Sequence, residues 1–386
     1  MTEIVDLTDD QLRSRRTVKW AVAPDDVLPA WVAEMDFALC PELAEAVARA
    51  VRDESTGYAP HDRSTGLPEA LGAHAATEWG WDVDPGRVVL TGDVMAGVLI
   101  ALTTLCENAP VVVPTPTYPP FLDVVPLAGR RLVEVPLDPD SPTASLDLER
   151  IDAELAAGAR TVLLCQPHNP WGRVFTSGEL EALRDVVVRH GAKVVSDEIH
   201  APLVLPGAAH VPYLTIDGTA DHGVAVLSAS KAWNVPGLKC AQIVTGTDAD
   251  AAALRNLPLV ANHGLSPLGI AANLAAWRNG GHWLAGLIRR LDANRALLGD
   301  LVGEHLPRVG TRPLEATYLA WLDARAYGHD RPAAVALERG RVMVNEGATF
   351  GAGGAGGVRL NIGTSPERLS EAVARLARAW EADTLP

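Results

Sequence analysis

Residues 227–237, LSASKAWNVPG, place a lysine, Lys231, at the end of an apolar run and just before a Pro-Gly turn. The chain has only four lysines, so the other 29 of its 33 basic residues are arginines. A lysine amine that is shielded from water loses part of its proton affinity and becomes a nucleophile for a carbonyl carbon. Lys231 is therefore a candidate for covalent chemistry, although a surface charge would also explain it when it is considered alone.

Four further apolar runs end in side chains or turns that a polar ligand could use. They are followed by TGDVMAG (91–97), PTPTYPPF (114–121), QPHNPWGRV (166–174) and SDEIH (196–200). The first opens a predicted helix, and the backbone N–H groups of its first turn could hold a phosphate. Taken singly, each segment has an ordinary structural explanation. Asp197 could cap a helix, and His200 could be a buried histidine with satisfied hydrogen bonds.

Seven apolar runs predict strands, and helical patterns lie between several of them. The strands are predicted at 87–92, 110–116, 131–137, 161–167, 192–198, 224–230 and 240–246. Helices are predicted from Pro41 and at 94–106, 146–157 and 177–190, with Ser177 as the cap of the last. This alternation predicts an α/β fold with a mainly parallel seven-stranded sheet and helices on both faces. Ligands bind at the carboxyl ends of the strands in such sheets, so the polar segments should meet there.

After about residue 265 the pattern changes to long helices and a smaller α+β region. Strands are predicted at 317–323, 341–347 and 357–363, with a last helix from Pro366. The glycine-rich segment 347–357 lacks the lysine of a phosphate loop, and we predict a flexible connection there. The predicted organisation is an N-terminal segment (1–40) that packs with the small domain, a large ligand-binding domain (41–280) and a small C-terminal domain (281–386).

Composition excludes several classes of partner. The formal net charge of −15 over 386 residues, without a Lys/Arg run, argues against nucleic acid. The N-terminus lacks the apolar core of a secretory signal, and the apolar stretches are too short to span a bilayer. The four cysteines lie far apart without a CxxC pair, which predicts free thiols in a reducing cytoplasm and no metal site.

One ligand suits the whole set of strand-end groups. Pyridoxal 5′-phosphate (PLP) needs an amine for its aldehyde, an acid for its ring nitrogen and N–H groups for its phosphate. The matching groups are Lys231, Asp197, the amide of Asn169, the ring of Tyr118 and the turn at 91–97. We therefore predict PLP as the cofactor.

The sequence resembles the fold-type I PLP enzymes of the class I/II aminotransferase superfamily, and within it the MalY/PatB-type cystathionine β-lyases, or C–S lyases. The resemblance extends over nearly the whole chain. It rests on WVAEMDF (31–37), TGYAP (56–60), PTPTYPPF, QPHNPWGR, SDEIHA, SASKAWNVPGLK and VRLNIG (358–363). The first of these, together with TPTYPPF and the histidine of SDEIH, points to the lyase branch, because typical aminotransferases have tyrosine in place of that histidine.

The resemblance implies a role for each matched position. Lys231 matches the lysine that forms the Schiff base and moves the Cα proton, and Asp197 matches the acid that faces the pyridine nitrogen. Arg359 matches the arginine that binds the substrate α-carboxylate through a two-pronged contact. Further cofactor contacts are implied at Asn169, Tyr118, His200, Val94, Met95, Ser228, Lys239 and, across a dimer interface, Tyr58. Further substrate contacts are implied at Trp31, Asp36 and Tyr58.

The implied reaction is β-elimination from an S-substituted L-cysteine, cystathionine-like or another conjugate, to thiol, pyruvate and ammonia. The motifs leave two other reactions of the same machinery open. One is transamination; the other is decarboxylation coupled to deamination of a cysteine conjugate, as in specialised pathways such as lincosamide biosynthesis. A purely regulatory protein would not need the complete set of Lys231, Asp197, Asn169 and Arg359. The resemblance also implies a cytoplasmic homodimer with shared active sites.

Several positions depart from the family pattern and bear on the substrate. Gln166, Trp171, Trp233 and Pro202 replace commoner residues beside the matched motifs, and Met95 adds bulk near the phosphate turn. These changes leave the set of cofactor residues intact, but they leave open which substrate is bound.

Overall fold

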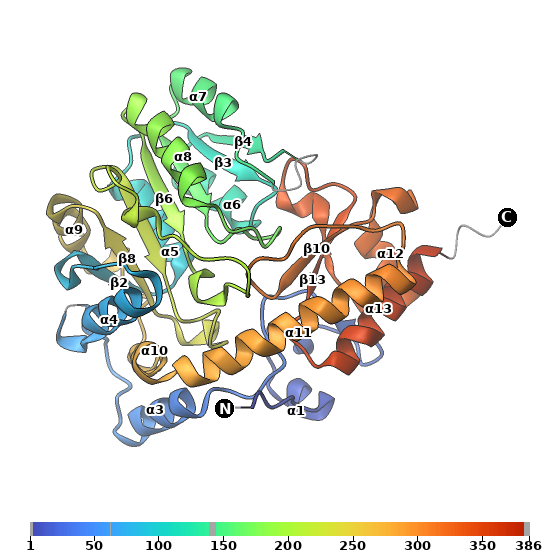
Figure 1. The fold of residues 1–386 in the computed structure, drawn as a ribbon. Helices are drawn as coiled ribbons and strands as arrows, with labels where there is room; N and C mark the ends of the chain where they lie inside the picture. The colour runs from blue at the N-terminus through green and yellow to red at the C-terminus, as the bar shows by residue number, and fades with distance from the viewer. Residues whose placement is uncertain (1–2, 62, 139–143, 382–386) are drawn as a thin grey trace.

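The computed structural model describes residues 3–61, 63–138 and 144–381, and its main element is a seven-stranded sheet in the order β2-β8-β7-β6-β5-β3-β4 (Figure 1). Its strands are β2 (Val88–Thr91), β3 (Val111–Thr115), β4 (Leu132–Pro136), β5 (Thr161–Cys165), β6 (Lys193–Asp197), β7 (Gly223–Leu227) and β8 (Ala241–Thr245). Only β8 runs antiparallel to its neighbours, β2 and β7. The prediction of a mainly parallel seven-stranded sheet is confirmed, and each predicted run overlaps one strand.

Helices cover both faces of this sheet because successive residues of a buried strand point to opposite sides. Val162 and Val194 pack into the apolar cluster of α7 and α8, whereas the next residues, Leu163 and Val195, pack into that of α5 and α6. The helices of this part are α3 (Pro41–Arg52), α4 (Leu67–Trp79), α5 (Val94–Thr104), α6 (Pro120–Leu127), α7 (Leu148–Ala156), α8 (Ser177–Arg189), α9 (Asp248–Arg255) and α10 (Pro267–Asn279).

One detail of helix capping differs from the sequence prediction. Ser177 is the first residue of α8, and Thr176 is the cap instead. The Thr176 hydroxyl accepts a hydrogen bond from the Glu179 N–H, while the Glu179 carboxylate accepts one from the Thr176 N–H. This reciprocal capping box satisfies two backbone donors, which a Ser177 cap without a glutamate three residues later would not do.

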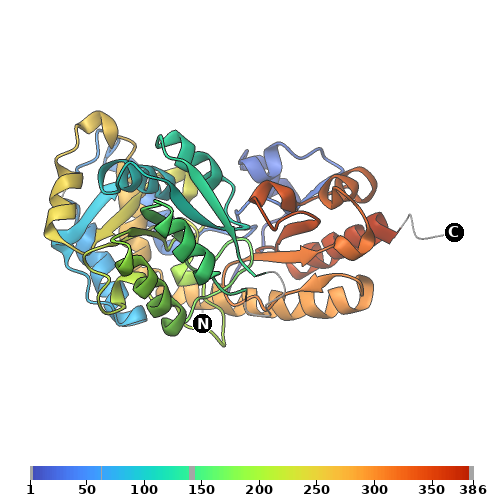
Figure 2. The same cartoon turned by 90° about the horizontal axis from the view of Figure 1, so that it is seen from above.

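The C-terminal part is built around a four-stranded antiparallel sheet in the order β12-β13-β10-β9, and Figure 2 shows it beside the large sheet. Its strands are β9 (Gly310–Thr311), β10 (Leu319–Asp323), β12 (Asn345–Glu346) and β13 (Gly357–Asn361), and its helices are α11 (Gly281–His305), α12 (Pro332–Gly340) and α13 (Pro366–Glu381). The predicted strand 341–347 is instead two short strands. The first, β11 (Val342–Met343), pairs with β1 (Leu28–Pro29) and not with β12.

The pairing of β1 with β11 ties the N-terminal segment, with α1 (Asp9–Ser14) and α2 (Val18–Ala21), to the C-terminal part. The packing of the whole segment 1–40 with the small domain stays a prediction, and residues 1–2 lie outside the described residues. The boundary near residue 280 stays a prediction, because α11 begins at Gly281 and packs into a core shared by both parts. The end of the predicted small domain, 382–386, also lies outside the described residues.

The glycine-rich segment 347–357 is a closely packed turn and not the loose connection that its composition predicted. A Cβ atom on Gly347 would lie 2.1 Å from the Gly354 carbonyl oxygen, and one on Gly357 would lie 2.1 Å from the Trp321 ring. Glycine is therefore required here by the close approach of neighbouring atoms.

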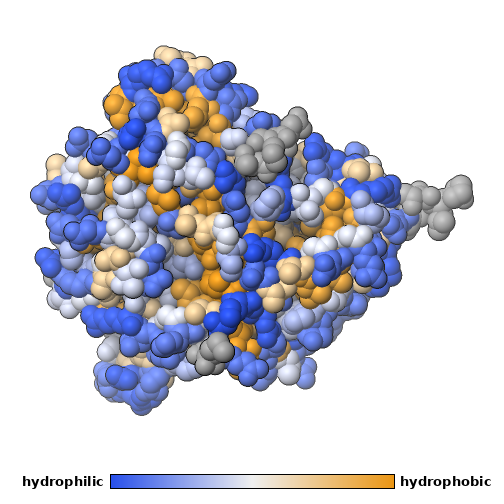
Figure 3. Space-filling view, in the orientation of Figure 1, coloured by the Kyte–Doolittle hydropathy of each residue, from blue (hydrophilic) through white to orange (hydrophobic). Residues whose placement is uncertain are grey.

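The surface shown in Figure 3 is mostly hydrophilic, with apolar side chains between the polar ones. Within the described ranges, no helix is long and apolar enough to cross a membrane.

Candidate active site

The predicted cofactor residues follow neighbouring parallel strands at one edge of the sheet. Asp197 is the last residue of β6, and Lys231 lies four residues after the end of β7. Asn169 follows β5 by four residues, and Tyr118 follows β3 by three. Since β3, β5, β6 and β7 are parallel and adjacent, their carboxyl ends bring these side chains together.

Asp197 is a buried carboxylic acid whose side chain accepts a hydrogen bond from the Ile199 N–H at 3.0 Å. Burial and the neighbouring Glu198 charge raise the pKa of Asp197 to about 7, although the Ile199 N–H and the Lys231 charge act in the opposite direction. A buried carboxylate of this kind is stabilised by a cationic donor. The protonated ring nitrogen of PLP is such a donor.

Lys231 extends toward the N-terminal segment, where its Nζ donates to the Ala33 carbonyl oxygen at 3.2 Å. Burial lowers the pKa of its amine to about 8; the Arg359 charge lowers it too, and Glu34 and Asp197 act in the opposite direction. A solvated lysine has a pKa of about 10.4, so the neutral, nucleophilic form is far more populated here near neutral pH. This is the property that bonding to an aldehyde requires.

Arg359 reaches the same edge from β13 in the other sheet. Its guanidinium donates to Asn169 Oδ1 at 3.0 Å, to Asn345 Oδ1 at 2.8 Å and to the Trp31 carbonyl oxygen at 3.1 Å. It is only 5% exposed, and burial lowers its pKa to about 10, so it stays charged. These three acceptors are neutral, and among the described residues the Nε of Arg359 has no partner. A buried cation without a carboxylate suits a carboxylate-bearing ligand.

Two aromatic side chains complete this pocket. Tyr118 is partly buried, its charge interactions include Asp197 and Arg359, and burial raises the pKa of its phenol. His200 is 2% exposed, with its ring 6.5 Å from that of Tyr318. Burial, together with the Lys231 and Arg359 charges, lowers the pKa of His200 to about 3, so the imidazole is neutral.

A phosphate-sized group would lie at the start of α5. Val94 and Met95 are its first two residues, and Asp93 caps it by accepting from the Ala96 N–H at 2.8 Å. Lys239 lies at this helix end and forms a 2.7 Å ion pair with Asp93. Sequence reasoning missed Asp93, although its position before a predicted helix signals a cap.

Of two other predicted cofactor contacts, Ser228 is buried and Tyr58 is exposed. The Ser228 hydroxyl is buried, donates to the Cys240 carbonyl oxygen at 2.7 Å and accepts from the Ser230 N–H at 3.1 Å. This anchors the turn that leads to Lys231. Tyr58, in contrast, is fully exposed and lies outside the pocket of its own chain.

The predicted substrate residue Asp36 instead has a structural position. Its carboxylate is buried, accepts from Lys19 Nζ at 2.8 Å and from the Trp20 indole at 2.8 Å, and neither partner belongs to the pocket. Asp36 anchors the N-terminal segment through Lys19 and Trp20, a role that the sequence motif did not reveal. We therefore leave Asp36 out of the proposed substrate contacts.

The segment 31–36 crosses the pocket as a strap. Asn234 binds both the Met35 N–H and its carbonyl oxygen at 2.9 Å, and Tyr318 donates to the Ala33 carbonyl oxygen at 2.9 Å. Trp31 contributes its carbonyl oxygen to Arg359. Asn234 and Tyr318 were missed by sequence reasoning because their contacts span about two hundred residues or more.

Asp36→Asn is expected to lower the free energy of unfolding by about 3–5 kcal/mol, because it leaves the Lys19 ammonium buried without a counter-charge. The Lys19 and Asp36 side chains are 1% and 2% exposed. Urea unfolding followed by tryptophan fluorescence measures the change. Asp26→Asn, which breaks the exposed pair with Arg341, is the matched control and should leave the midpoint unchanged. Equal effects of the two variants would contradict this assignment.

The described residues fit PLP. They supply a buried amine of lowered pKa, a buried acid of raised pKa, an aromatic ring and a helix N-terminus with a lysine beside it. Residues 32–376 match the family model "Aminotransferase class I and II".

Relatives and a solved structure match over nearly the full length. A Mycobacterium leprae protein, provisionally named a cystathionine beta-lyase, is 44% identical and aligned over 97% of both chains. The cystathionine beta-lyase of Corynebacterium glutamicum is 37% identical, with 95% of this chain and 98% of that one aligned. A crystal structure from Corynebacterium diphtheriae, provisionally described as a PLP-dependent beta-cystathionase, has a TM-score of 0.92 and 36% identity over 98% of this chain and 99% of that one. The chain belongs to the PLP-dependent class I and II aminotransferase family, in its cystathionine β-lyase branch.

Proposed function

We propose that the protein is a C–S β-lyase that converts an S-substituted L-cysteine and water to a thiol, pyruvate and ammonia. The observation that carries this proposal is the position of the Arg359 guanidinium, which lies beside the Lys231 amine without a carboxylate partner. An α-amino acid held there by its carboxylate would present its amino group and Cα to the lysine side of the pocket.

Each side chain has a separate task in this reaction. PLP, when bound, accepts the electron pair that deprotonation leaves on Cα. Asp197 holds the proton on the ring nitrogen, which the buried carboxylate favours. Lys231, as a neutral amine of lowered pKa, would remove the Cα proton of the substrate.

The bond that breaks next is the one between Cβ and sulfur. The sulfur leaves with the bonding electron pair and becomes the thiol, and water then replaces the nitrogen to give pyruvate and ammonia. Burial and the Lys231 charge lower the pKa of His200 to about 3, below that of Lys231, so the Cα proton would go to Lys231 and not to the imidazole.

Arg359→Lys is expected to raise KM about 10- to 100-fold while the cofactor is retained, because lysine cannot make the two parallel contacts of a guanidinium. Absorbance of the bound cofactor and steady-state kinetics measure both parts. Arg325→Lys, in an exposed pair with Asp323, is the control. An unchanged KM would place the carboxylate contact elsewhere.

The reaction is tested by incubating the holoenzyme with L-cystathionine and other cysteine S-conjugates while thiol, pyruvate, ammonia and carbon dioxide are measured together. Equal amounts of thiol, pyruvate and ammonia are expected. A keto acid that keeps its sulfur, formed only with an amino-group acceptor, would establish an aminotransferase. Release of carbon dioxide would establish the decarboxylating reaction.

We also propose a homodimer in the cytoplasm. Tyr58 is fully exposed, and the apolar Leu259 and Val260 are 66% and 77% exposed. The segment 257–259 lines a surface cavity of about 750 Å³ together with His61 and Arg63, which a second copy of the chain could cover. The four cysteines are free, in keeping with a reducing compartment. Light scattering of the holoenzyme tests the dimer, which a monomeric mass would rule out.

A further inference from the structure

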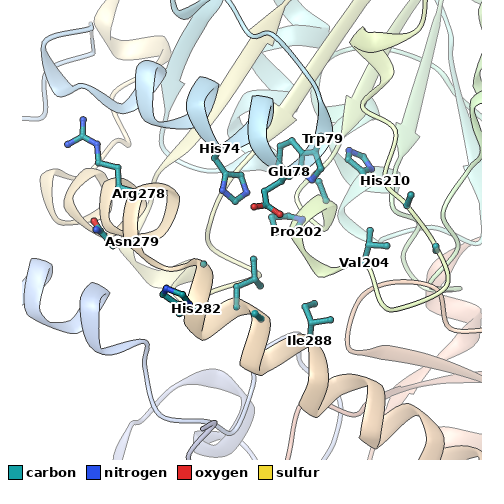
Figure 4. Close-up of a pocket in the computed structure, with 16 residues that line it drawn as sticks. His74, Glu78, Trp79, Pro202, Val204, His210, Arg278, Asn279, His282 and Ile288 are labelled. Carbon is teal, nitrogen blue, oxygen red and sulfur yellow. The ribbon is translucent and has the colours of Figure 1, made fainter. Parts of the chain in front are cut away.

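A second cavity, of about 850 Å³, lies outside the pocket of Lys231 and Arg359 (Figure 4). Its walls come from α4, the segment after β6 and helices α10 and α11. His74 and Glu78 extend into it from α4, and His210 faces the end of that helix at Trp79. The His210 and Trp79 rings meet edge to face, with centroids 5.6 Å apart.

His210 connects this cavity with a buried carboxylate. Its Nε2 lies 3.1 Å from Glu198 Oε2, and the His210 and Glu198 side chains are 1% and 0% exposed. Glu198 Oε1 accepts from the Ser196 hydroxyl at 2.9 Å and from the Tyr213 N–H at 2.9 Å. The carboxylate therefore receives three hydrogen bonds. Among the described residues, the other ring nitrogen of His210 has no partner.

Glu198 directly follows Asp197, which faces the cofactor ring in the proposed site. Like charges disfavour each other's ionised form, and Glu198 acts on Asp197 in this direction. An isolated Glu198 anion would therefore work against an ionised Asp197, which the ring nitrogen requires. A cation beside Glu198 removes this conflict, and His210 is the ionisable partner that contacts it.

We propose that Glu198 and His210 form a buried ion pair and that His210 is a positioning residue: its charge offsets that of Glu198, so that Asp197 stays ionised against the ring nitrogen of the cofactor. The proposal concerns the cofactor contact and rests on the PLP assignment. It does not depend on which substrate is cleaved.

Other ionisable groups surround the pair. On the Asp197 side lies Lys231, whose charge lowers the pKa of Asp197. Tyr118 and Cys165 also lie there, and the Asp197 charge raises the pKa of each, which keeps both neutral. The remaining ionisable groups around the cavity and beyond Tyr213 are His74, Glu78, Arg278, His282 and His222. Burial lowers the pKa of His74 to about 4, so it is neutral and does not replace His210 as the cation.

The test is the pH midpoint at which the absorbance of the holoenzyme cofactor changes, measured beside the pH profile of kcat/KM. Glu198→Gln leaves the cation unbalanced and should lower the midpoint by about half to one pH unit. His210→Gln leaves the anion unbalanced and should raise it by about the same amount. His210→Lys restores a cation and should return the midpoint toward that of the wild type.

The opposite signs distinguish an ion pair from a structural role. Ser196→Ala removes a hydrogen bond to Glu198 without changing charge, and Glu78→Gln removes a carboxylate from the same cavity; neither should move the midpoint. Shifts of equal sign for Glu198→Gln and His210→Gln, or no shift in either, would overturn the proposal. If His210→Gln does not fold, His210→Asn replaces it, because only loss of the His210 charge distinguishes a paired from an unpaired Glu198. If the wild-type protein supplied with PLP shows no cofactor absorbance, the cofactor assignment itself is refuted.

Discussion

Lys231→Ala abolishes both covalent attachment of the cofactor and turnover, and this is the largest effect that the structure predicts. The lysine supplies two functions at once, the amine that holds the aldehyde and the base that removes the Cα proton. A positioned base alone contributes about 10²–10⁴-fold, so the loss of kcat is expected to be at least that large. Borohydride reduction of the wild type followed by peptide mapping should place the label on residue 231.

Lys193→Ala provides the control for this variant. Lys193 forms an ion pair with Asp250 at 2.8 Å, at the opposite end of β6 from Asp197. It should keep the absorbance, the label at Lys231 and the turnover of the wild type. A Lys231→Ala protein with an unchanged spectrum would overturn the whole assignment of the site.

Asp197→Asn should reduce kcat about 10²-fold or more while PLP remains bound. The amide has nearly the same shape as the carboxylate, so the buried position can be filled without a cavity. It has no charge to hold a proton on the ring nitrogen, and the cofactor then accepts electrons from Cα poorly. The measurement is kcat together with the cofactor content of the purified variant.

Asp250→Asn is the matched control for Asp197→Asn, because it removes a carboxylate that forms an ion pair with Lys193 at the opposite end of β6. It should change kcat little. If Asp197→Asn retained full turnover with a full complement of PLP, the ring nitrogen would have to contact another group, and the proposed contribution of Glu198 and His210 would also fail.

The bulky departures from the family pattern have structural positions that the sequence did not reveal. Trp171 is 4% exposed and packs in the cluster of Trp321 and Phe350, with the Arg312 guanidinium 4.3 Å from its ring. Trp233 is fully buried and donates to the Gly280 carbonyl oxygen at 3.2 Å. Both side chains fill the core, so their contacts do not indicate which substrate is bound.

Much of the fold could be predicted from the sequence because its signals are local. Buried parallel strands are continuous apolar runs, and those runs identified all seven strands of the large sheet. Short or densely packed elements were less predictable. The pairing of β11 with β1 and the close packing of Gly347 and Gly357 depend on atoms far away in the chain.

The sequence by itself determined the chemistry at the strand ends, since a lysine, an acid and an amide that follow parallel strands must meet at one edge of the sheet. Only the tertiary structure decided how these groups are charged and supported. Arg359 donates to Asn169, which lies 190 residues away in the chain, and Asp36 forms an ion pair with Lys19 instead of contacting the site. Glu198 is paired with His210 beside Asp197. The physical reason is that burial and distance between side chains set proton affinity, and both arise only when separate segments pack together.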